Sequence, residues 1–477
     1  MATTTIPAVP ELSPYVKKTA TTGNYINFAD SSFDTWAQQY LPELYEAEVE
    51  RYGDRSVSSF LRLVGAELPM ASDQVIWSEQ GRLHIARTGL SCTDAGVVTC
   101  SNTAIRKGST VLVTGGGLSG SHVCYVSEGS ETSTSQFKIL PYKVAAMSNL
   151  SGWDNSKTID VFVFGSEFGK GQSGMAAGVN PEVDTFDNRP IIMKDVFKVS
   201  GSDAAQIGWI EVSGEAGQNG YLWYLKAEGD TRVRFEDYLE MAMIEAIKGV
   251  PGSSTVDSVD IIGNAGESFG TQGLFDAIKS RGLEADQVFS SSEDVIPNFD
   301  VILKELDKQG AIEENMMFLN RTASIAMDDA LATLNSGYDG GTSWGVFQNS
   351  EQMALNLGFV GFRRGSYDFY KSDWKYLNNK STRGGANFGD VQGVLIPAGT
   401  SSVYDQMLGK NVRRPFLHVR YRASETEDRK LKSWVVGSVG GAANSDVDDM
   451  NVHYLSERCL VTQAANNFCI FTDANYN

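Results

Sequence analysis

The chain has few of the residues that most often build catalytic and metal sites. Its 477 residues include only four histidines and five cysteines, and no two histidines lie near each other in the sequence. No two cysteines are separated by two residues, so the spacing typical of zinc sites is absent. An odd number of dispersed cysteines is typical of reduced thiols in a protein made in a cytosol, and it argues against a dense disulfide framework.

Long apolar runs are also missing. No stretch approaches the roughly 18 apolar residues that a membrane-spanning helix needs. The chain begins MATTTIPAVPELSP, which has neither the basic start nor the apolar centre of a signal peptide. The zinc-protease pattern H-E-x-x-H does not occur, and nothing supports a histidine-based triad. The sequence therefore predicts no catalytic residue, no metal ligand and no cofactor.

The charge is strongly one-sided. The chain has 40 basic and 59 acidic residues, which gives a net charge of −19. Such a balance argues against a protein whose main work is to grip nucleic-acid phosphates, and it suits a protein that must stay soluble at high concentration. Glycine is abundant at 48 residues while proline is limited to 12, a combination that favours a strand-rich chain with tight turns.

The N-terminal third changes character twice. Residues 1–30 are rich in threonine and proline, which predicts an extended arm, and apolar residues recur at helical spacing within 33–64. Residues 85–150 are instead rich in threonine, serine, glycine and valine, with strand-like runs between glycine and serine turns. This block predicts a small all-β module inserted between segments of another type.

A glycine-rich stretch at 165–178 lies inside residues 158–212, with strand-like segments on either side. A strand, a long excursion and a second strand form the pattern of an extended hairpin. Its tip has too few apolar residues to bury a core, so we expect the hairpin to lie on another surface.

The clearest helix is predicted at residues 232–248. Asp230 and Thr231 can cap its start, and Gly249 and Pro251 mark its end. Helical and strand-like segments alternate beyond it, which predicts a mixed α+β chain without an internal repeat. Further helices are expected at 274–280, 299–309 and 323–334, and strands at 191–199, 315–320, 343–347, 357–362, 393–396, 416–421 and within 458–472.

Two glycine-rich turns match parts of phosphate-binding patterns. Residues 115–120 (GGGLSG) fit G-x-G-x-x-G, but a strand-like segment follows where a dinucleotide site needs a helix, so a hairpin turn is predicted. Residues 263–266 (GNAG) have no third glycine at the right place and no Lys-Ser/Thr pair, so a loop is predicted.

Two charged clusters complete the candidates. Asp446, Asp448 and Asp449 could bind a cation, although three carboxylates on a turn are more often a solvated loop. The arginines of segment 413–422 could contact phosphate. Basic and apolar residues alternate there, however, which is more simply a strand with one polar face.

Six segments carry a resemblance to a known family. In order they are FVFGSEFGKGQSG (162–174), FDNRPIIMKD (186–195), VSGSDAAQIGW (199–209), GLFDAIKSRG (273–282), MFLNR (317–321) and a closing stretch that begins YLSERCL (454–460). With the helix at 232–248 after the first three, this order resembles that of the major capsid proteins of tailed double-stranded DNA bacteriophages. It is most similar to crAss-like and related phages.

The resemblance implies an α+β Hong Kong 97-type capsid fold. Its parts would be an N-terminal arm with helices (1–65), an extended loop region (66–230) with an inserted all-β domain at about 85–150, the spine helix of a peripheral domain (231–255), an axial domain (256–415) and return strands of the peripheral domain (416–477).

The resemblance also implies the function. Hexamers and pentamers of the chain would self-assemble into the icosahedral shell that encloses the phage genome, without enzymatic activity. Assembly would occur in the bacterial host cytoplasm, and partners in the virion would include portal, scaffold and cement or head-fibre proteins. Double-stranded DNA would be enclosed without sequence-specific binding, and no membrane would be involved. The residues expected at subunit contacts in the extended loop are Phe164, Glu167, Phe168, Lys170, Phe186 and Asn188.

A second class of function is also open. The chain would then be a virion decoration or surface protein that binds or hydrolyses carbohydrate, with the β block at 85–150 as its binding module. Aromatic residues near Trp344, Trp374 and Tyr376 would line a sugar groove, although such residues are more often part of a core or an interface.

Overall fold

The computed structural model has mixed α and β structure in two compact units. One unit is Trp77–Phe186, and the other combines Met1–Ile76 with Asp187–Asn477. The structure describes residues 60, 66–82, 84–101, 104–129, 131, 133–175, 183–202, 222–249, 270–289, 295–310, 312–336, 360–385, 390–398, 400–405, 410–439 and 443–473. The predicted arm at 1–30, most of 33–64, the strand at 343–347 and the loop at 263–266 lie outside these residues.

The unit Trp77–Phe186 is a closed β-barrel. Its strands are β3 (Ala86–Cys92), β4 (Val97–Thr99), β5 (Ser109–Gly115), β6 (His122–Glu128), β7 (Gln136–Pro141) and β8 (Ile159–Ser166), closed in the order β3-β4-β7-β6-β5-β8. The interior is apolar and includes Val98, Val111, Val126, Ile139 and Ile159, none of them exposed. Closure leaves no unpaired edge, which is one way in which small β folds avoid pairing with other chains.

The predicted hairpin at 158–212 is wrong. Strand β8 pairs with β3 and β5 inside the barrel, whereas the following long strand, β10 (Ile191–Ser200), pairs with β20 (Asp449–Thr462). The β-rich block therefore runs beyond the predicted border near residue 150. The physical reason is the alternation in β8, where buried Ile159 and Val161 complete the barrel core.

The glycine-rich turn at 115–120 is confirmed as a hairpin turn. It joins β5 to β6, which pair antiparallel, and no helix follows it. Gly115, Gly116, Gly117 and Gly120 all have positive φ angles. Only glycine adopts that backbone region without steric cost, so these glycines serve the turn and not a phosphate.

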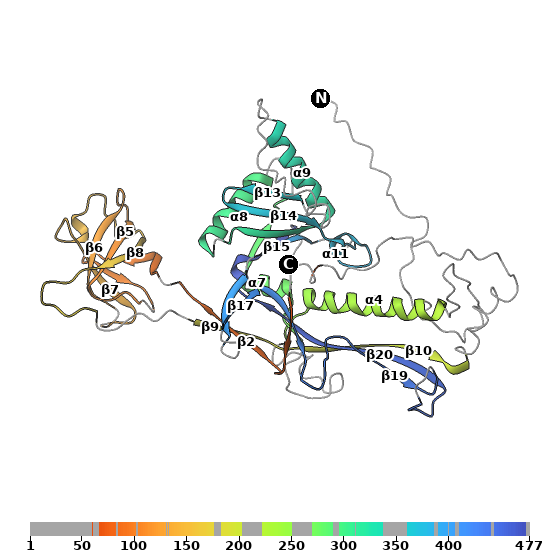
Figure 1. Ribbon diagram of the computed structural model, residues 1–477. Coiled ribbons are helices and arrows are strands. Elements are labelled where there is room, and N and C mark those ends of the chain that lie inside the picture. The colour runs from red at the N-terminus through yellow and green to blue at the C-terminus, as the bar shows by residue number, and fades with distance from the viewer. Residues whose placement is uncertain are drawn as a thin grey trace, which may run out of the picture. The chain divides into compact units, whose positions relative to one another are not determined.

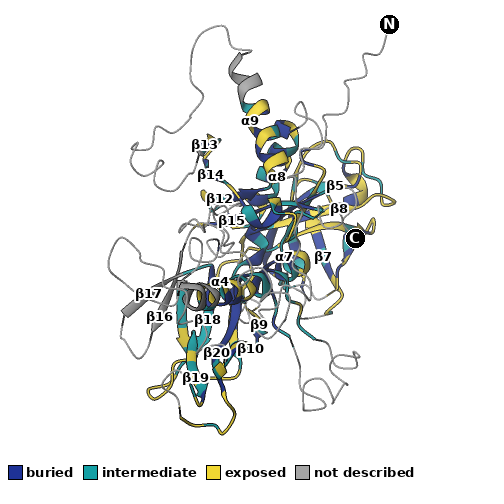
Figure 2. Ribbon diagram, turned by 90° about the vertical axis from the view of Figure 1, so that its right-hand side faces the viewer, coloured by how far each residue is buried: buried dark blue, intermediate teal, exposed yellow. Residues whose placement is uncertain are grey.

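The second unit contains a five-stranded sheet built from distant parts of the chain. Its strands are β1 (Ala66–Met70), β18 (Leu417–Arg422), β20, β10 and β19 (Lys432–Gly437). Strand β20 pairs with β10 over ten residues along one edge and with β18 and β19 along the other. Because strands from both ends of the described chain meet here, the sheet depends on long-range pairing. Figure 2 shows β20 as mostly buried.

A long helix, α4 (Leu222–Glu245), packs along this sheet (Figure 1). Phe235 and Leu239 bury against β10 and β20, while Met243 and Ile244 reach a separate core. The prediction placed the start of this helix at 232, but it begins ten residues earlier and runs through Gly229. An interior glycine costs about 1 kcal/mol in helix propensity, and the burial of the apolar face offsets that cost.

A mixed six-stranded sheet forms the rest of the unit. Its order is β11 (Leu283–Asp286), β21 (Cys469–Thr472), β15 (Val391–Pro397), β12 (Glu314–Leu319), β14 (Tyr367–Asp373) and β13 (Val360–Arg364). Helices α8 (Val295–Lys308) and α9 (Arg321–Ser336) cover one face, and α7 (Leu274–Arg281) with the end of α4 covers the other. Both faces of β12 are therefore buried, in agreement with its continuous apolar sequence.

Most of the other predicted elements in this unit are confirmed. The helices predicted at 274–280, 299–309 and 323–334 are α7, α8 and α9, and the strands predicted at 191–199, 315–320, 393–396 and 416–421 are β10, β12, β15 and β18. Two short ribbons complete the described strands, one of β2 (Val75–Gln80) with β9 (Val183–Asn188) and one of β16 (Thr400–Asp405) with β17 (Lys410–Pro415).

All five cysteines are buried free thiols. Burial raises the pKa of Cys124 to about 11 and the pKa values of Cys92 and Cys459 to about 12, because the thiolate is poorly solvated there. Since the thiolate is the reactive form, we expect the folded chain to react with less than one equivalent of a thiol reagent at pH 8. The same reagent should label five thiols after denaturation, as counted by mass spectrometry, and rapid labelling of the folded chain would contradict the burial.

Candidate subunit-contact surface

The residues predicted at subunit contacts fall into two groups. Phe164, Glu167, Phe168 and Lys170 lie at the end of β8 and just beyond it, and all four are exposed. Phe186 is half-buried in β9, where its ring lies 6.2 Å from that of Trp77. The first group therefore lies on the surface of the barrel, on its last strand and on the segment that follows.

A β-bulge directs Phe164 outward. In the β5–β8 pairing, Val111 lies opposite Val163 and Thr110 lies opposite Gly165, so Phe164 is the extra residue on β8. Bulges re-aim side chains and often occur beside functional surfaces. The Phe164 side chain is 52% exposed, which is unusual for so large an apolar group and marks a candidate contact residue.

The segment after β8 is fastened to the barrel at Gly108. The Glu167 backbone N–H donates to the Gly108 carbonyl at 2.9 Å, and the Tyr142 hydroxyl donates to the Glu167 carboxylate. The ring of Phe168 lies over Gly108, whose φ is +88°, and a Cβ placed there would meet the ring at 2.5 Å. The sequence leaves room for the ring by having glycine at this position.

An apolar stripe crosses the outer face of the barrel beside these residues. We define it as Leu112, Val123, Tyr125, Leu140, Tyr142, Phe162 and Phe164. The strand register places Val123 of β6, Leu112 of β5 and Phe162 of β8 in one row across the barrel. Tyr142 extends this row, because its backbone N–H donates to the Val123 carbonyl. In the next row Tyr125 lies opposite Leu140. The stripe therefore spans β7, β6, β5 and β8.

Val123, Leu140 and Tyr142 are not among the contact residues predicted from the sequence. A signal for them exists in the segment HVCYV at 122–126, where both faces of the strand are apolar. Cys124 and Val126 fill the barrel, while Val123 is 43% exposed. A barrel strand with an apolar outer face predicts a contact surface, because water normally meets polar side chains there.

Asn188, the last of the residues predicted at subunit contacts, lies at the end of β9. It is 1% exposed in the single chain, and its side chain is hydrogen-bonded to neighbouring segments. The amide donates to the carbonyls of Gln272 and Leu460, and its oxygen accepts from the Gln272 N–H and the Thr271 hydroxyl. This residue therefore joins the end of β9 to β20 and to the segment before α7.

The remaining sequence candidates do not assemble into a site. Trp374 and Tyr376 are 4% and 5% exposed and belong to a core, so they line no sugar groove; Trp344 lies outside the described residues. Asp449 is buried and paired with Lys198 at 2.9 Å. Strand β18, predicted from the alternation in 416–421, has Arg422 bonded to Asp73.

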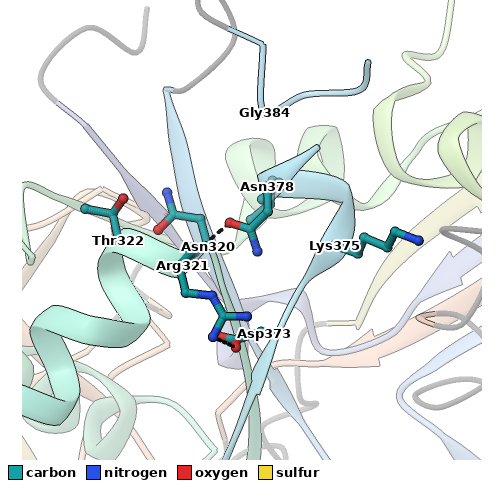
Figure 3. A pocket seen from close by; sticks show the side chains of 8 residues that line it. Asn320, Arg321, Thr322, Asp373, Lys375, Asn378 and Gly384 are labelled. Carbon is teal, nitrogen blue, oxygen red and sulfur yellow. Dashed lines mark hydrogen bonds and ion pairs between the residues drawn. The ribbon is translucent and has the colours of Figure 1, made fainter. Parts of the chain in front are cut away.

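A surface pocket of about 780 Å³ lies at the start of α9 (Figure 3). Arg321 pairs there with Asp373 at 2.5 Å, and its backbone N–H donates to the Asn378 side chain at 2.6 Å. The Lys375 side chain points away from that pair in Figure 3. The Arg321 guanidinium and the Asp373 carboxylate neutralise each other, and we assign no ligand to this pocket.

Three further observations concern chemistry and membranes. Among the residues that the structure describes, no group of three or more His, Cys, Asp and Glu side chains is placed to hold a metal ion. No helix in that part of the chain is long and apolar enough to cross a membrane. The letters G-x-S-x-G of a serine-nucleophile turn occur at 266–270 and 341–345, and both serines lie outside the described residues.

Comparisons with known proteins gave structural similarity alone. No family model and no curated protein matches the sequence. In the mature capsid of bacteriophage PhiM1, a chain aligns at 9% identity over 91% of this chain and 93% of its own, with a TM-score of 0.39. The capsid of cyanophage P-SCSP1u gives 9% identity, coverage of 98% and 100%, and a TM-score of 0.38. A chain of Gordonia phage Cozz aligns at 9% identity over 97% of this chain and 99% of its own, with a TM-score of 0.40.

Proposed function

We propose that the chain is a major capsid protein whose hexamers and pentamers form the icosahedral shell of a tailed bacteriophage. The proposal rests on the order of the segments that carry the family resemblance. The observation that carries it furthest is the packing of α4 along the long β10–β20 pairing.

The parts of the chain have proposed roles in that shell. The region 66–230, which contains the barrel, serves as the extended loop with its inserted domain, and α4 serves as the spine helix. Residues 256–415, with most of the six-stranded sheet, form the axial domain, and residues 416–477 return to the peripheral domain. Portal, scaffold and cement or head-fibre proteins are the proposed partners besides other copies of the chain.

The five-stranded sheet supports a role in assembly. Residues of β10 alternate between the side that faces α4 and the opposite side. On the opposite side, Ile192 and Val196 are 53% and 46% exposed. Apolar side chains of this size on a regular sheet favour a surface that another subunit covers.

The charge of the chain fits a container better than a nucleic-acid reader. A net charge of −19 disfavours tight binding to phosphates, so the enclosed double-stranded DNA would be held without sequence-specific contacts. The same charge keeps free subunits soluble before assembly. The proposed role needs no catalytic residue, cofactor or metal.

Electron microscopy and light scattering of the purified wild-type chain test the proposal. We expect closed shells, or discrete hexamers and pentamers, because repetition of one contact by symmetry builds a large assembly from a single sequence. Glycan-binding measurements on the same sample serve as the control for the alternative class. A chain that stays monomeric at high concentration and binds a glycan would overturn the proposal.

A further inference from the structure

We propose that the apolar stripe of the barrel binds the same stripe on a second copy of this chain. The contact would be two-fold, with each copy contributing the outer face of β5, β6, β7 and β8. This inference rests on the proposed function, since it names a contact between subunits of the shell. It assigns a role to the barrel, which the sequence resemblance leaves as an insertion without one.

The stripe is large and continuous for the surface of so small a unit. Tyr142, Val123 and Phe162 are 50%, 43% and 43% exposed, although they lie in one row across the barrel. Leu140 at 37% and Phe164 at 52% extend the patch on either side. Scattered apolar residues on a surface need no explanation, but a contiguous patch of this kind marks an interaction site.

The chemistry of the stripe favours a protein occupant over a sugar. Val123, Leu112 and Phe162 offer no hydrogen-bonding groups, whereas recognition of a sugar needs polar side chains that bond to its hydroxyls. Of the two tyrosine hydroxyls in the stripe, that of Tyr142 already donates to Glu167. A patch made mainly of apolar side chains instead resembles the centre of an interface between proteins.

The distribution of charge favours a second copy as that protein. Residues 77–186 contain eight basic and nine acidic residues, a net charge of −1, so the rest of the chain carries −18 of the total of −19. Two copies that approach through the rest of the chain meet more like charge than two barrels do, and like charges disfavour an encounter. The nearly neutral barrel is the unit through which copies meet at the smallest electrostatic cost.

The border of the stripe is compatible with self-association. On β6 and β7 the stripe is bordered by a charged pair beside Tyr125 and Leu140. Glu128 and Lys138 lie opposite each other there and form an ion pair at 4.0 Å. A two-fold interface requires a patch that complements itself. An apolar centre with a charge-balanced border meets that requirement, whereas a border of one sign would not.

Crosslinking of Val123→Cys in the full chain tests the contact. The two introduced thiols would lie near the two-fold axis, and a short bismaleimide should join them into covalent dimers. The natural thiols are buried, so the wild-type chain should give little background. Thr99→Cys is the matched control, because Thr99 is exposed on β4, a barrel strand that the stripe does not cross.

A second substitution checks that the stripe is the surface responsible. Phe162→Glu in the Val123→Cys chain should lower the yield of crosslinked dimer on the order of tenfold, because a buried carboxylate costs more than 1.4 kcal/mol. Phe162 is exposed in the single chain, so the variant should keep the thermal unfolding profile of its parent.

The outcomes separate this inference from the proposed function. Dimers from Val123→Cys that are absent from Thr99→Cys support the contact, even where the wild type forms no shells and the capsid proposal fails. Monomers alone from Val123→Cys overturn the contact, even where the wild type forms normal shells. Equal dimer yields from the two cysteine variants, or an unchanged yield with Phe162→Glu, also overturn it.

Discussion

Replacement of Phe60 by alanine should lower the free energy of unfolding by about 3–5 kcal/mol. Phe60 is 2% exposed and stacks on Trp374, with ring centroids 4.3 Å apart. It also meets Phe318 edge to face at 4.6 Å. Truncation would remove these contacts and leave a cavity in a core that cannot close around it fully. The loss is large because this ring fills the core beside the six-stranded sheet.

Denaturant unfolding followed by tryptophan fluorescence measures this effect, since Trp374 lies against the substituted ring. Phe164→Ala is the matched control, because it removes the same atoms from a side chain that is 52% exposed. The control should change the free energy of unfolding by less than about 0.5 kcal/mol in an unassembled chain. Equal effects of the two substitutions would contradict the placement of Phe60 in the core.

Replacement of Asn188 by alanine should lower the free energy of unfolding by about 2–4 kcal/mol. The substitution leaves five groups without their partner. The hydroxyl of Thr271 and the carbonyl of Leu460 are buried, and the N–H of Arg189 and the N–H and carbonyl of Gln272 are partly buried. Buried polar groups that lose a hydrogen bond keep the full cost of their removal from water. A cavity large enough for one water molecule would recover only part of that loss.

The same unfolding experiment measures this second effect. Asn155→Ala is the control, because the Asn155 amide is exposed and donates to Asp94 at 3.3 Å on the surface. We expect a change of less than about 0.5 kcal/mol for the control. A loss at Asn188 no larger than the control would contradict the hydrogen bonds assigned to it.

The sequence predicts helices and strands here better than it predicts which strands pair. The spacing of apolar residues locates α7, α8 and β12, because in each element the apolar residues are the ones that become buried. The partner of β8 does not follow from such a pattern, since an alternating strand fits a hairpin and a barrel equally well. The choice depends on which long-range pairing buries Ile159 and Val161, and that is a property of the whole unit.

The start of α4 shows a related limit. Asp230 and Thr231 favour the start of a helix by local propensity, and the prediction followed them. In the folded chain the burial of Phe235 and Leu239 on the sheet outweighs a propensity cost of about 1 kcal/mol. Tertiary packing decides such a boundary, and it leaves no local mark in the sequence.

The sequence predicts only part of the candidate contact surface, because contacts between distant segments decide which side chains turn outward. Phe164, Glu167 and Phe168 follow a recognisable segment and lie on the surface. Asn188 lies in a comparable segment but turns inward, because the carbonyl of Leu460 and the N–H of Gln272 need its amide. The local sequence around Asn188 does not reveal either of these hydrogen-bond partners. The stripe itself becomes visible only when the register aligns Leu112, Val123 and Phe162.

The mass of the species formed by the purified wild-type chain tests the central claim most directly. Analytical ultracentrifugation or native mass spectrometry over a range of concentrations gives the number of copies per particle. The capsid proposal predicts five- and six-fold multiples of the 51.8 kDa chain, or particles that contain hundreds of copies. A single species at 51.8 kDa at every concentration would contradict it.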